Sequence, residues 1–468
     1  MIRRTVPQKT ISKESSLNGV GLHTGEHVNL IFKPAPSNTG LVFIREDISG
    51  ENSIQAHIKF ISNTDRGTNL DNGKFRIHTS EHVLAALTGL DIDNCYICMD
   101  GAEVPIMDGS SKFFIKAIEE AKIVEQNALR EEFIPSKKIS FECEETGSNI
   151  SIIPDEKYRI DTKIDFNTKV LGTQTASIKS ISDFKNEISS ARTFSFLHEL
   201  ETLLEHGLIK GGDLNNAIVY VDKPLANSNM DRLKKAFNKD SISVTPNGIL
   251  DNLSLHYPNE AARHKLLDVI GDLALIGMKI RGKVIAEKPG HTVNAKFAQK
   301  VSEMIKADRN NILPELDFDK KPLMDSGQIM NVIPHRPPFL LIDEVLELSE
   351  SHVIGLRRVE HTESWVKGHF PGAPVMPGVL QVEFMAQAGG VLVLNTVPDP
   401  ENYLTFFMKM DKCKFKDTVV PGDILICKLE LISPIRRGII HMHGQTFVGD
   451  KIKSEGEFMA KIIKKNQL

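Results

Sequence analysis

A histidine and an aspartate four residues apart, His264 and Asp268, are the first side chains whose types and spacing could do chemistry. On a helix both would project from one face and could share a metal ion. A catalytic zinc ion takes three protein ligands and leaves a position for water. His82 is the candidate third ligand, and Glu81 beside it is placed to act as a general base. The spacing is also common on ordinary surface helices, so the pair alone leaves both interpretations open.

A second candidate site lies further along the chain, around Glu383. Apolar residues surround this glutamate at 379–388, which predicts a buried helix. Because burying an unpaired carboxylate is costly, Glu383 needs a partner or a function. His369, in the loop Gly-His-Phe-Pro-Gly at 368–372, could provide it. A purely structural glutamate–histidine pair would explain the same residues, and this alternative also stays open.

The elements that must position the first site form a repeat. Residues 80–118 predict a helix, a glycine turn, a strand, a loop and a second helix, and residues 264–301 predict the same order. The simplest account is two α+β domains of like topology, each bringing one histidine-bearing helix to a shared cleft. We therefore expect one domain at 1–127 and a second at 128–305.

The elements around the second site predict a different architecture. Residues 306–325 are rich in charge and contain prolines, which is typical of an interdomain linker. Beyond it, at 326–468, we expect a long helix at 377–390 that ends at a glycine pair and is accompanied by antiparallel strands. A central helix with several such strands predicts a hot-dog fold.

Composition narrows the classes of function. The 468 residues suit about three domains at ~150 residues each. A net charge of −4 gives no global basic field, so nucleic acid is not an expected partner. No stretch approaches the ~18 apolar residues of a transmembrane segment. The five cysteines are an odd number and argue for a reducing compartment, and the basic N-terminus lacks the apolar run of a signal peptide, so we expect a cytoplasmic protein.

Two weaker signals have plain alternatives. Cys95 and Cys98 form a CxxC pair, which suggests redox or zinc chemistry, but they lie in a predicted strand and no second pair exists. We expect them to be buried structural residues. Three lysines alternate along a later strand, at Lys412, Lys414 and Lys416, and would share an exposed face. They could bind an acidic carrier protein, although a solvated strand face is favoured.

A set of longer motifs gives the first site its context. They read GVGLHTG at 19–25, SEH at 80–82, EVPIMDGS at 103–110, ARTF at 191–194, RHKLLD at 263–268 and GH at 290–291. Together they closely resemble the LpxC family, the UDP-3-O-acyl-N-acetylglucosamine deacetylases of lipid A synthesis, over residues 1–305. The resemblance implies one zinc ion per chain, bound by His82, His264 and Asp268, and a UDP-linked acylated glucosamine as substrate. Residues 220–257 look longer than the family's usual link and are expected to form a surface insertion.

The LpxC resemblance also implies a role for each neighbouring side chain. Glu81 would activate the water that attacks the acetamide, and Thr193 would hydrogen-bond the oxyanion. His291, kept cationic by Asp272, would protonate the departing amine. Two further side chains would contact the substrate, namely Lys265 and Phe194.

The second site lies in another set of motifs. They read PHRPPFLLID at 334–343, GHFPG at 368–372, PGVL at 377–380, MAQ at 385–387 and VPGD at 420–423. These match the FabZ family, the 3-hydroxyacyl-[acyl-carrier-protein] dehydratases, over 326–468. The related dehydratase-isomerase FabA carries aspartate where this chain has Glu383, so plain dehydration of a (3R)-hydroxyacyl-carrier to the trans-2-enoyl product is expected.

The FabZ resemblance implies a site shared between two subunits. His369 would remove the C2 proton, and Glu383 of the partner would assist loss of the 3-hydroxyl, with no cofactor. Such a site requires a homo-oligomer, and the family's usual trimer of dimers implies a homohexamer, with acyl carrier protein as a further partner. The whole chain is thus expected to be a bifunctional enzyme. The rival hypothesis is a deacetylase whose hot-dog domain only oligomerises or binds the carrier, and the presence of both His369 and Glu383 argues against it.

Overall fold

The computed structural model of the chain divides into two compact units, Met1–Asp308 and Arg309–Leu468. It describes residues 2–64, 67–198, 216–222, 234, 243–246, 248–250, 254–310, 313, 316, 320–449 and 451–467. Both units combine helices with sheets, so the predicted α+β class is confirmed.

The first unit begins with a five-stranded sheet. Its strand order is β2 (Ser15–Val20), β3 (His27–Pro34), β9 (Cys95–Met99), β4 (Leu41–Arg45) and β5 (Ser53–Gln55). Strand β9 runs parallel to β4, and the other neighbours are antiparallel. Alternate residues of β3 are buried, namely Val28, Leu30 and Phe32, because successive side chains of a strand point to opposite faces. Helix α2 (Lys112–Glu120) packs against this sheet at β2.

A second five-stranded sheet in the same unit repeats this plan. Its order is β11 (Ile139–Cys143), β12 (Ser148–Ile153), β18 (Gly282–Glu287), β13 (Tyr158–Asp165) and β14 (Thr173–Ile178). Here too the third strand runs parallel to the fourth, and the other pairs are antiparallel. Order and direction therefore match the first sheet pair by pair, which confirms the prediction of two substructures of like topology.

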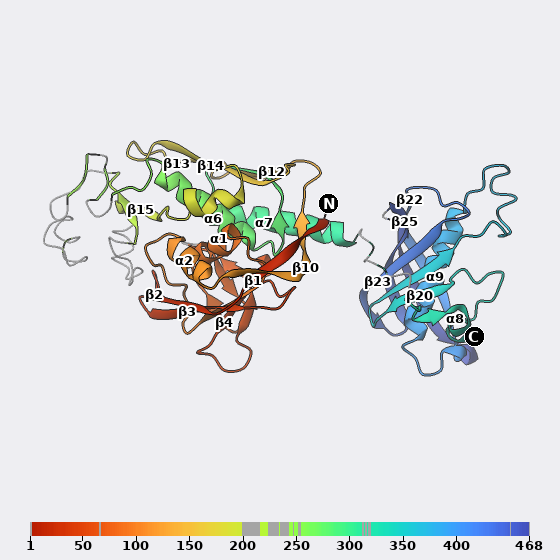
Figure 1. The fold of residues 1–468 in the computed structure, drawn as a ribbon. Helices are drawn as coiled ribbons and strands as arrows, with labels where there is room; N and C mark the ends of the chain where they lie inside the picture. The colour runs from red at the N-terminus through yellow and green to blue at the C-terminus, as the bar shows by residue number, and fades with distance from the viewer. Residues whose placement is uncertain are drawn as a thin grey trace. The chain divides into compact units, whose positions relative to one another are not determined.

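Two helices lie between these sheets and face each other. Helix α1 (Glu81–Gly89) packs along α6 (Glu260–Ala274), and α6 also packs on β13 and β14. Figure 1 shows both helices between the sheet that contains β2 to β4 and the sheet that contains β12 to β14. Every residue of α1 is buried, which accounts for its weak polar–apolar division.

Shorter elements complete the first unit. A three-stranded sheet joins β1 (Ile2–Ile11), β10 (Ile123–Phe133) and β17 (Lys279–Ile280), and the boundary that we placed at residues 127–128 falls inside β10. Small sheets pair β6 (Ile61–Asn63), β7 (Asn69–Asp71) and β8 (Arg76–Ile77), and β15 (Phe194–Phe196) with β16 (Ile218–Tyr220). The remaining described α-helices of this unit are α3 (Phe184–Glu187) and α7 (His291–Asn310).

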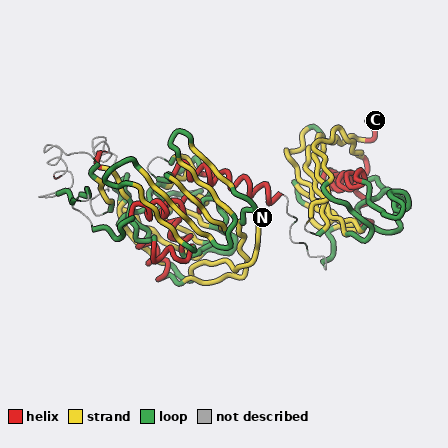
Figure 2. The backbone as a smooth tube through the Cα atoms, turned by 90° about the horizontal axis from the view of Figure 1, so that it is seen from above, coloured by secondary structure: helices red, strands yellow, loops and turns green. Residues whose placement is uncertain are grey.

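The second unit is a curved sheet around one helix. The strands follow the order β19 (Met324–Asp325), β20 (Glu344–Leu348), β21 (His352–Arg358), β23 (Ile424–Arg436), β24 (Ile439–Val448), β25 (Lys451–Lys464) and β22 (Tyr403–Phe415). Helix α9 (Gly378–Leu394) packs against five of these strands, and Figure 2 shows it in the curve of the sheet. A short helix, α8 (Ser326–Val332), precedes β20. The predicted hot-dog fold is confirmed.

The end of α9 differs from the sequence expectation. The glycine pair at 389–390 was expected to end the helix, but α9 continues to Leu394. A Cβ atom at Gly389 would lie 2.6 Å from the terminal carbon of Met442, on β24. The glycine therefore lets the helix approach the sheet, a use that local sequence does not reveal.

Two predicted segments are only partly described. The sequence predicts a linker at 306–325, but α7 extends through Asn310, so the first residues of that range are helical. Residues 311, 312, 314, 315 and 317–319 lie outside the described residues. So does most of the predicted insertion at 220–257, including 223–233 and 235–242.

The cysteine pair and the three alternating lysines both have ordinary structural surroundings. Cys95 and Cys98 are free thiols buried in β9, and burial raises the pKa of Cys95 to about 12. Each lysine of the predicted exposed face contacts a glutamate of β25: Lys412 with Glu457, and Lys414 and Lys416 with Glu455. Their charge is thus largely balanced within the sheet. In the described part of the chain, no helix has the length and apolar character needed to cross a bilayer.

Candidate functional site

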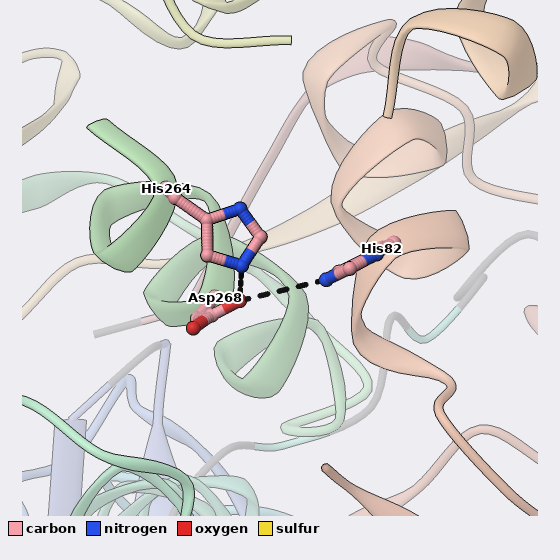
Figure 3. Close-up of side chains that lie close together, drawn as sticks. All are labelled: His82, His264 and Asp268. Carbon is pink, nitrogen blue, oxygen red and sulfur yellow. Dashed lines mark ion pairs between the residues drawn. The ribbon is translucent and has the colours of Figure 1, made fainter. Parts of the chain in front are cut away.

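Helices α1 and α6 bring His82, His264 and Asp268 together, although the first lies far from the others in sequence. One nitrogen or oxygen of each residue lies within 4.8 Å of those of the other two, and all three residues are buried. His264 Nε2 is 3.3 Å and His82 Nε2 is 3.9 Å from Asp268 Oδ1. Figure 3 shows His82 reaching from its helix towards the pair on α6.

The protonation of these side chains suits metal binding. His264 Nδ1 donates to the carbonyl oxygen of Ala191 at 3.1 Å, which leaves Nε2 free to face the aspartate. Burial, reinforced by His264, lowers the pKa of His82 to about 3. Burial would raise the pKa of Asp268, but the charge of Lys265 and the histidines holds it below its usual value. The group therefore offers two neutral imidazoles and a carboxylate.

One carboxylate oxygen of this group, Asp268 Oδ1, indicates that a cation would fit between the three side chains. Asp268 Oδ1 is buried and has no hydrogen-bond donor among the described residues, while Nε2 of His264 and Nε2 of His82 lie 3.3 and 3.9 Å from it. A buried carboxylate oxygen without a partner is unfavourable. A cation between the three side chains would satisfy it, and two histidines with one carboxylate are a typical donor set for catalytic zinc. The residues present thus fit a metal ion.

The close approach of the two helices depends on a glycine. A Cβ atom at Gly271 of α6 would lie 2.1 Å from the backbone oxygen of Glu81 on α1. No side chain can occupy that space. Gly271 lies three residues after Asp268, so it brings the ligand-bearing turns of both helices into contact.

Glu81 is held beside the metal-type group. Its Oε2 accepts from the backbone N–H of Thr68 at 2.9 Å, and its Oε1 lies 4.0 Å from His291 Nε2. Burial raises the pKa of Glu81 to about 7, against the opposing effect of the His291 charge. A carboxylate whose pKa lies near neutrality is suited to accept and release a proton.

His291 is held by a carboxylate with three donors. Its Nδ1 donates to Asp272 Oδ2 at 3.0 Å, and the same oxygen accepts from Asn294 Nδ2 at 2.8 Å. Thr68 Oγ1 donates to the other oxygen, Oδ1. Burial would lower the pKa of His291, but the charge of Asp272 and its hydrogen bond raise it to about 9. His291 is therefore a cation with a proton to donate at neutral pH.

These two pKa values predict a bell-shaped pH dependence for amide hydrolysis. Glu81 must be ionised to act as a base, so kcat/KM should rise as pH increases through about 7. His291 must be protonated to act as an acid, so kcat/KM should fall as pH increases through about 9. A bound cation stabilises the carboxylate and destabilises the imidazolium, and would move both limbs to lower pH.

The profile of a His291→Gln variant checks this assignment. It should have a lower rate and should lack the descending limb. An unchanged descending limb in that variant would show that another group supplies the proton.

Of the remaining predicted site residues, Lys265 and Phe194 have side chains close to the metal-type residues, whereas Thr193 has only backbone hydrogen bonds described. Lys265 Nζ donates to Asp268 Oδ2 at 2.8 Å and lies 5.7 Å from the centre of the Phe194 ring. That ring lies 6.4 Å from the ring of His264. The described hydrogen bonds of Thr193 are made by its backbone, with Gly109 and Ile218. The oxyanion role of its hydroxyl therefore stays a prediction.

Three supporting residues were not found from the residue pattern. Thr68 contacts both Glu81 and Asp272, Asn294 holds Asp272, and Gly271 permits the helix contact. Asn294 follows His291 by three residues on α7, a spacing that puts both on one helix face and could have revealed it. Thr68 gives no such signal.

The candidate residues of the second unit lie on separate elements. His369 Nδ1 donates to the carbonyl oxygen of Val375 at 2.8 Å, which leaves Nε2 available. Glu383, on α9, accepts from Gln387 Nε2 at 2.9 Å, and its Oε1 lies 3.5 Å from His335 Nε2. Among the contacts described for this unit, none joins His369 to Glu383 within one chain. A site that combines them across two subunits stays a prediction.

Comparison with known proteins identifies a family for each of the two units. A family model described as LpxC, UDP-3-O-acyl N-acetylglycosamine deacetylase, matches residues 8–239 and 229–303, and a FabA-like domain model matches 333–457. A relative from Bacteroides thetaiotaomicron, named bifunctional enzyme LpxC/FabZ, is 44% identical over 98% of this chain and 99% of its own length. The chain belongs to the bifunctional LpxC/FabZ family.

Other relatives agree with this membership. An LpxC/FabZ enzyme from Porphyromonas gingivalis is also 44% identical, over 98% of this chain and 99% of its own length. A UDP-3-O-acyl-N-acetylglucosamine deacetylase from Myxococcus xanthus is 39% identical but covers 63% of this chain and 86% of its own length. The Myxococcus relative thus matches about two thirds of this chain, whereas the LpxC/FabZ relatives match both units.

Proposed function

We propose that this chain catalyses two reactions of lipid A and fatty acid biosynthesis. The first unit would hydrolyse the acetamide of UDP-3-O-(3-hydroxyacyl)-N-acetylglucosamine to the free amine and acetate. The second would dehydrate (3R)-hydroxyacyl-[acyl-carrier-protein] to the trans-2-enoyl product. The observation that carries the first assignment is the buried group of His82, His264 and Asp268, with a base and an acid beside it.

The deacetylase residues divide the work of amide hydrolysis. Zinc, bound by the three ligands at one ion per chain, would lower the pKa of water and polarise the acetamide carbonyl. Glu81 takes a proton from the attacking water, and His291 gives a proton to the departing amine, which is a poor leaving group until it is protonated. Asp272 keeps His291 cationic, since its negatively charged carboxylate accepts a hydrogen bond from the Nδ1–H group. Further roles follow from the LpxC resemblance: oxyanion binding by Thr193 and substrate contacts by Lys265 and Phe194.

The dehydratase residues need no cofactor. His369 Nδ1 donates to Val375, so the lone pair of Nε2 can accept the C2 proton of the thioester. The C2–H electron pair forms the new double bond as the C3–O bond breaks. Glu383 of the partner subunit must enter this step as a carboxylic acid: its proton passes to the departing hydroxyl, which leaves as water, and Glu383 is left as a carboxylate beside the protonated His369.

The edge of the hot-dog sheet supports a homo-oligomer. Strand β22 ends the sheet order, so one edge is available to another copy. Its exposed side chains include a run of large apolar residues: Phe406, Phe407, Met408 and Met410. Such a surface favours burial against an identical strand, and we propose a homohexamer built from such pairs. Acyl carrier protein would deliver the second substrate. We place both reactions in the cytoplasm, where free cysteines stay reduced.

Assaying both reactions on the intact protein tests the proposal. A zinc chelator should abolish deacetylation and leave dehydration unchanged, because only the first unit offers the His-His-Asp group among the described residues. Added zinc should restore the first activity. Loss of dehydration in chelator would refute the assignment of two independent sites. A protein that deacetylates but never dehydrates would favour the rival hypothesis of a binding or oligomerisation domain.

A further inference from the structure

The carboxylate of Glu383 is held by a glutamine whose orientation is fixed. Gln387 Oε1 accepts from the backbone N–H of Leu341 at 2.7 Å, and Gln387 Nε2 donates to the carbonyl oxygen of Phe339 at 2.9 Å. The oxygen must face the N–H and the nitrogen must face the carbonyl, so the amide cannot be flipped. Gln387 therefore presents an N–H group to Glu383 Oε1.

A histidine reaches the same oxygen from another element. His335 Nε2 lies 3.5 Å from Glu383 Oε1, and the side chain of Glu383 is 23% exposed. His335 Nδ1 is buried and has no hydrogen-bond partner in the part of the chain that the structure describes, whereas Nε2 has Glu383 as a polar neighbour. Burial lowers the pKa of His335, which favours a neutral ring that can carry its proton on Nε2. Long donor–acceptor distances in a site without substrate, such as the 3.5 Å between His335 Nε2 and Glu383 Oε1, commonly shorten when substrate binds.

Two side chains approach the same oxygen of Glu383, so its other oxygen, Oε2, can serve a different partner. Gln387 and His335 both approach Oε1, and no described hydrogen bond occupies Oε2. Glu383 and His335 line a common cavity of about 260 Å³, whose walls include Leu404, Phe407 and Met442. A carboxyl group fixed by one oxygen can offer the second to a substrate hydroxyl in a constant geometry.

We propose that His335 is a positioning residue of the dehydratase, which orients the carboxyl group of Glu383 in its own chain. This inference rests on the proposed dehydratase function. Each site would then combine His335 and Glu383 of one subunit with His369 of the other. The two motifs at 334–343 and 377–387 thus serve one half of the site together.

Kinetics of single variants test the positioning role. His335→Leu should lower the dehydration kcat roughly 10- to 100-fold, with KM within about threefold, because the substrate still binds but meets a misoriented carboxyl group. His335→Gln should retain most of the activity, since the glutamine Nε2 is as many bonds from the backbone as the histidine Nε2. His352→Leu is the matched control: His352 Nε2 lies 3.5 Å from Glu347 Oε2 and outside the cavity, so kcat should not change.

Mixed oligomers test whether His335 acts within the chain of Glu383. Two differently tagged full-length variants would be co-expressed and purified through both tags. His369→Ala with His335→Leu should recover activity. If chains pair at random within a hexamer, about half of the dimers are mixed, and half of the sites in each mixed dimer are intact. The expected activity is therefore about a quarter of the wild-type value. Glu383→Gln with His335→Leu should recover nothing, because every site lacks one of the two residues.

The pair His369→Ala with Glu383→Gln separates the two proposals. Its recovery supports the shared dehydratase site, and its failure would refute that site while leaving the single-variant kinetics to decide the role of His335. A His335→Leu enzyme within threefold of the wild-type kcat would overturn the inference. So would a His335→Gln enzyme as impaired as His335→Leu, or recovery by the Glu383→Gln and His335→Leu pair.

Discussion

Replacing Glu81 with glutamine should lower the deacetylation kcat by about 10²- to 10⁴-fold, the usual contribution of a general base. Glutamine has nearly the same shape and can still accept from Thr68 N–H, but it cannot take a proton from water. Zinc content should stay at one ion per chain because Glu81 is outside the ligand group. Steady-state kinetics and metal analysis of the same sample check both parts.

Two comparisons make the Glu81 result interpretable. Glu119→Gln, on α2, removes a glutamate whose partner is the exposed Lys185, and it should leave kcat unchanged. Dehydration by the Glu81→Gln protein should also be unaffected, since that reaction is assigned to the other unit. A loss smaller than tenfold would show that another group is the base, and a loss that tracks zinc content would make Glu81 a structural residue.

A single methyl group at Gly271 should disrupt the first unit. Its Cβ would lie 2.1 Å from the backbone oxygen of Glu81, and neither helix can shift without moving a buried ligand. We expect Gly271→Ala to cost about 3 kcal/mol or more, the upper range for overpacking a core. Deacetylation should be lost with it, because α1 and α6 carry His82 and His264. Thermal unfolding and zinc content measure the effect.

Gly390→Ala is the matched control for this substitution. Gly390 is also a buried glycine inside a helix, but its nearest neighbour for a new Cβ would be Ile333 at 3.5 Å, an ordinary contact. Alanine favours helix over glycine by roughly 0.5–1 kcal/mol, so the second unit should be unchanged or more stable. Equal losses for both variants would mean that the effect at Gly271 is not steric.

The sequence predicted the parts of the site that depend on local spacing. His264 and Asp268 meet because residues four apart share a helix face, and the repeated order of elements predicted two sheets of like topology. His82 was a candidate from the repeat of helix-bearing units, but its contact with α6 is tertiary, and the family motifs were needed to favour it as the third ligand. The loop at 368–372 and Glu383 were also found from residue types, and within one chain no described contact joins His369 to Glu383.

Other features could not be found this way because their causes lie far apart in sequence. Thr68 and Asp272 are 204 residues apart, and nothing around Thr68 marks it as a donor to that carboxylate. The glycine pair at 389–390 resembled a helix end, but Gly389 makes room for Met442 of β24. His335 was noted only as part of a motif. Its nearness to Glu383 is a tertiary contact, in a segment whose residues Phe339 and Leu341 are held by Gln387 of α9. In each case the packing of distant elements decides the role.

The placement of the two compact units on one polypeptide has a quantitative consequence for the cell. Each translation event yields one LpxC-type unit and one FabZ-type unit, so their molar ratio is fixed whatever the level of expression. Proteolytic turnover that removes the whole chain removes both in proportion. The ratio of the two rates that this polypeptide supports then depends on turnover numbers and substrate supply, and a change in its expression scales both rates together.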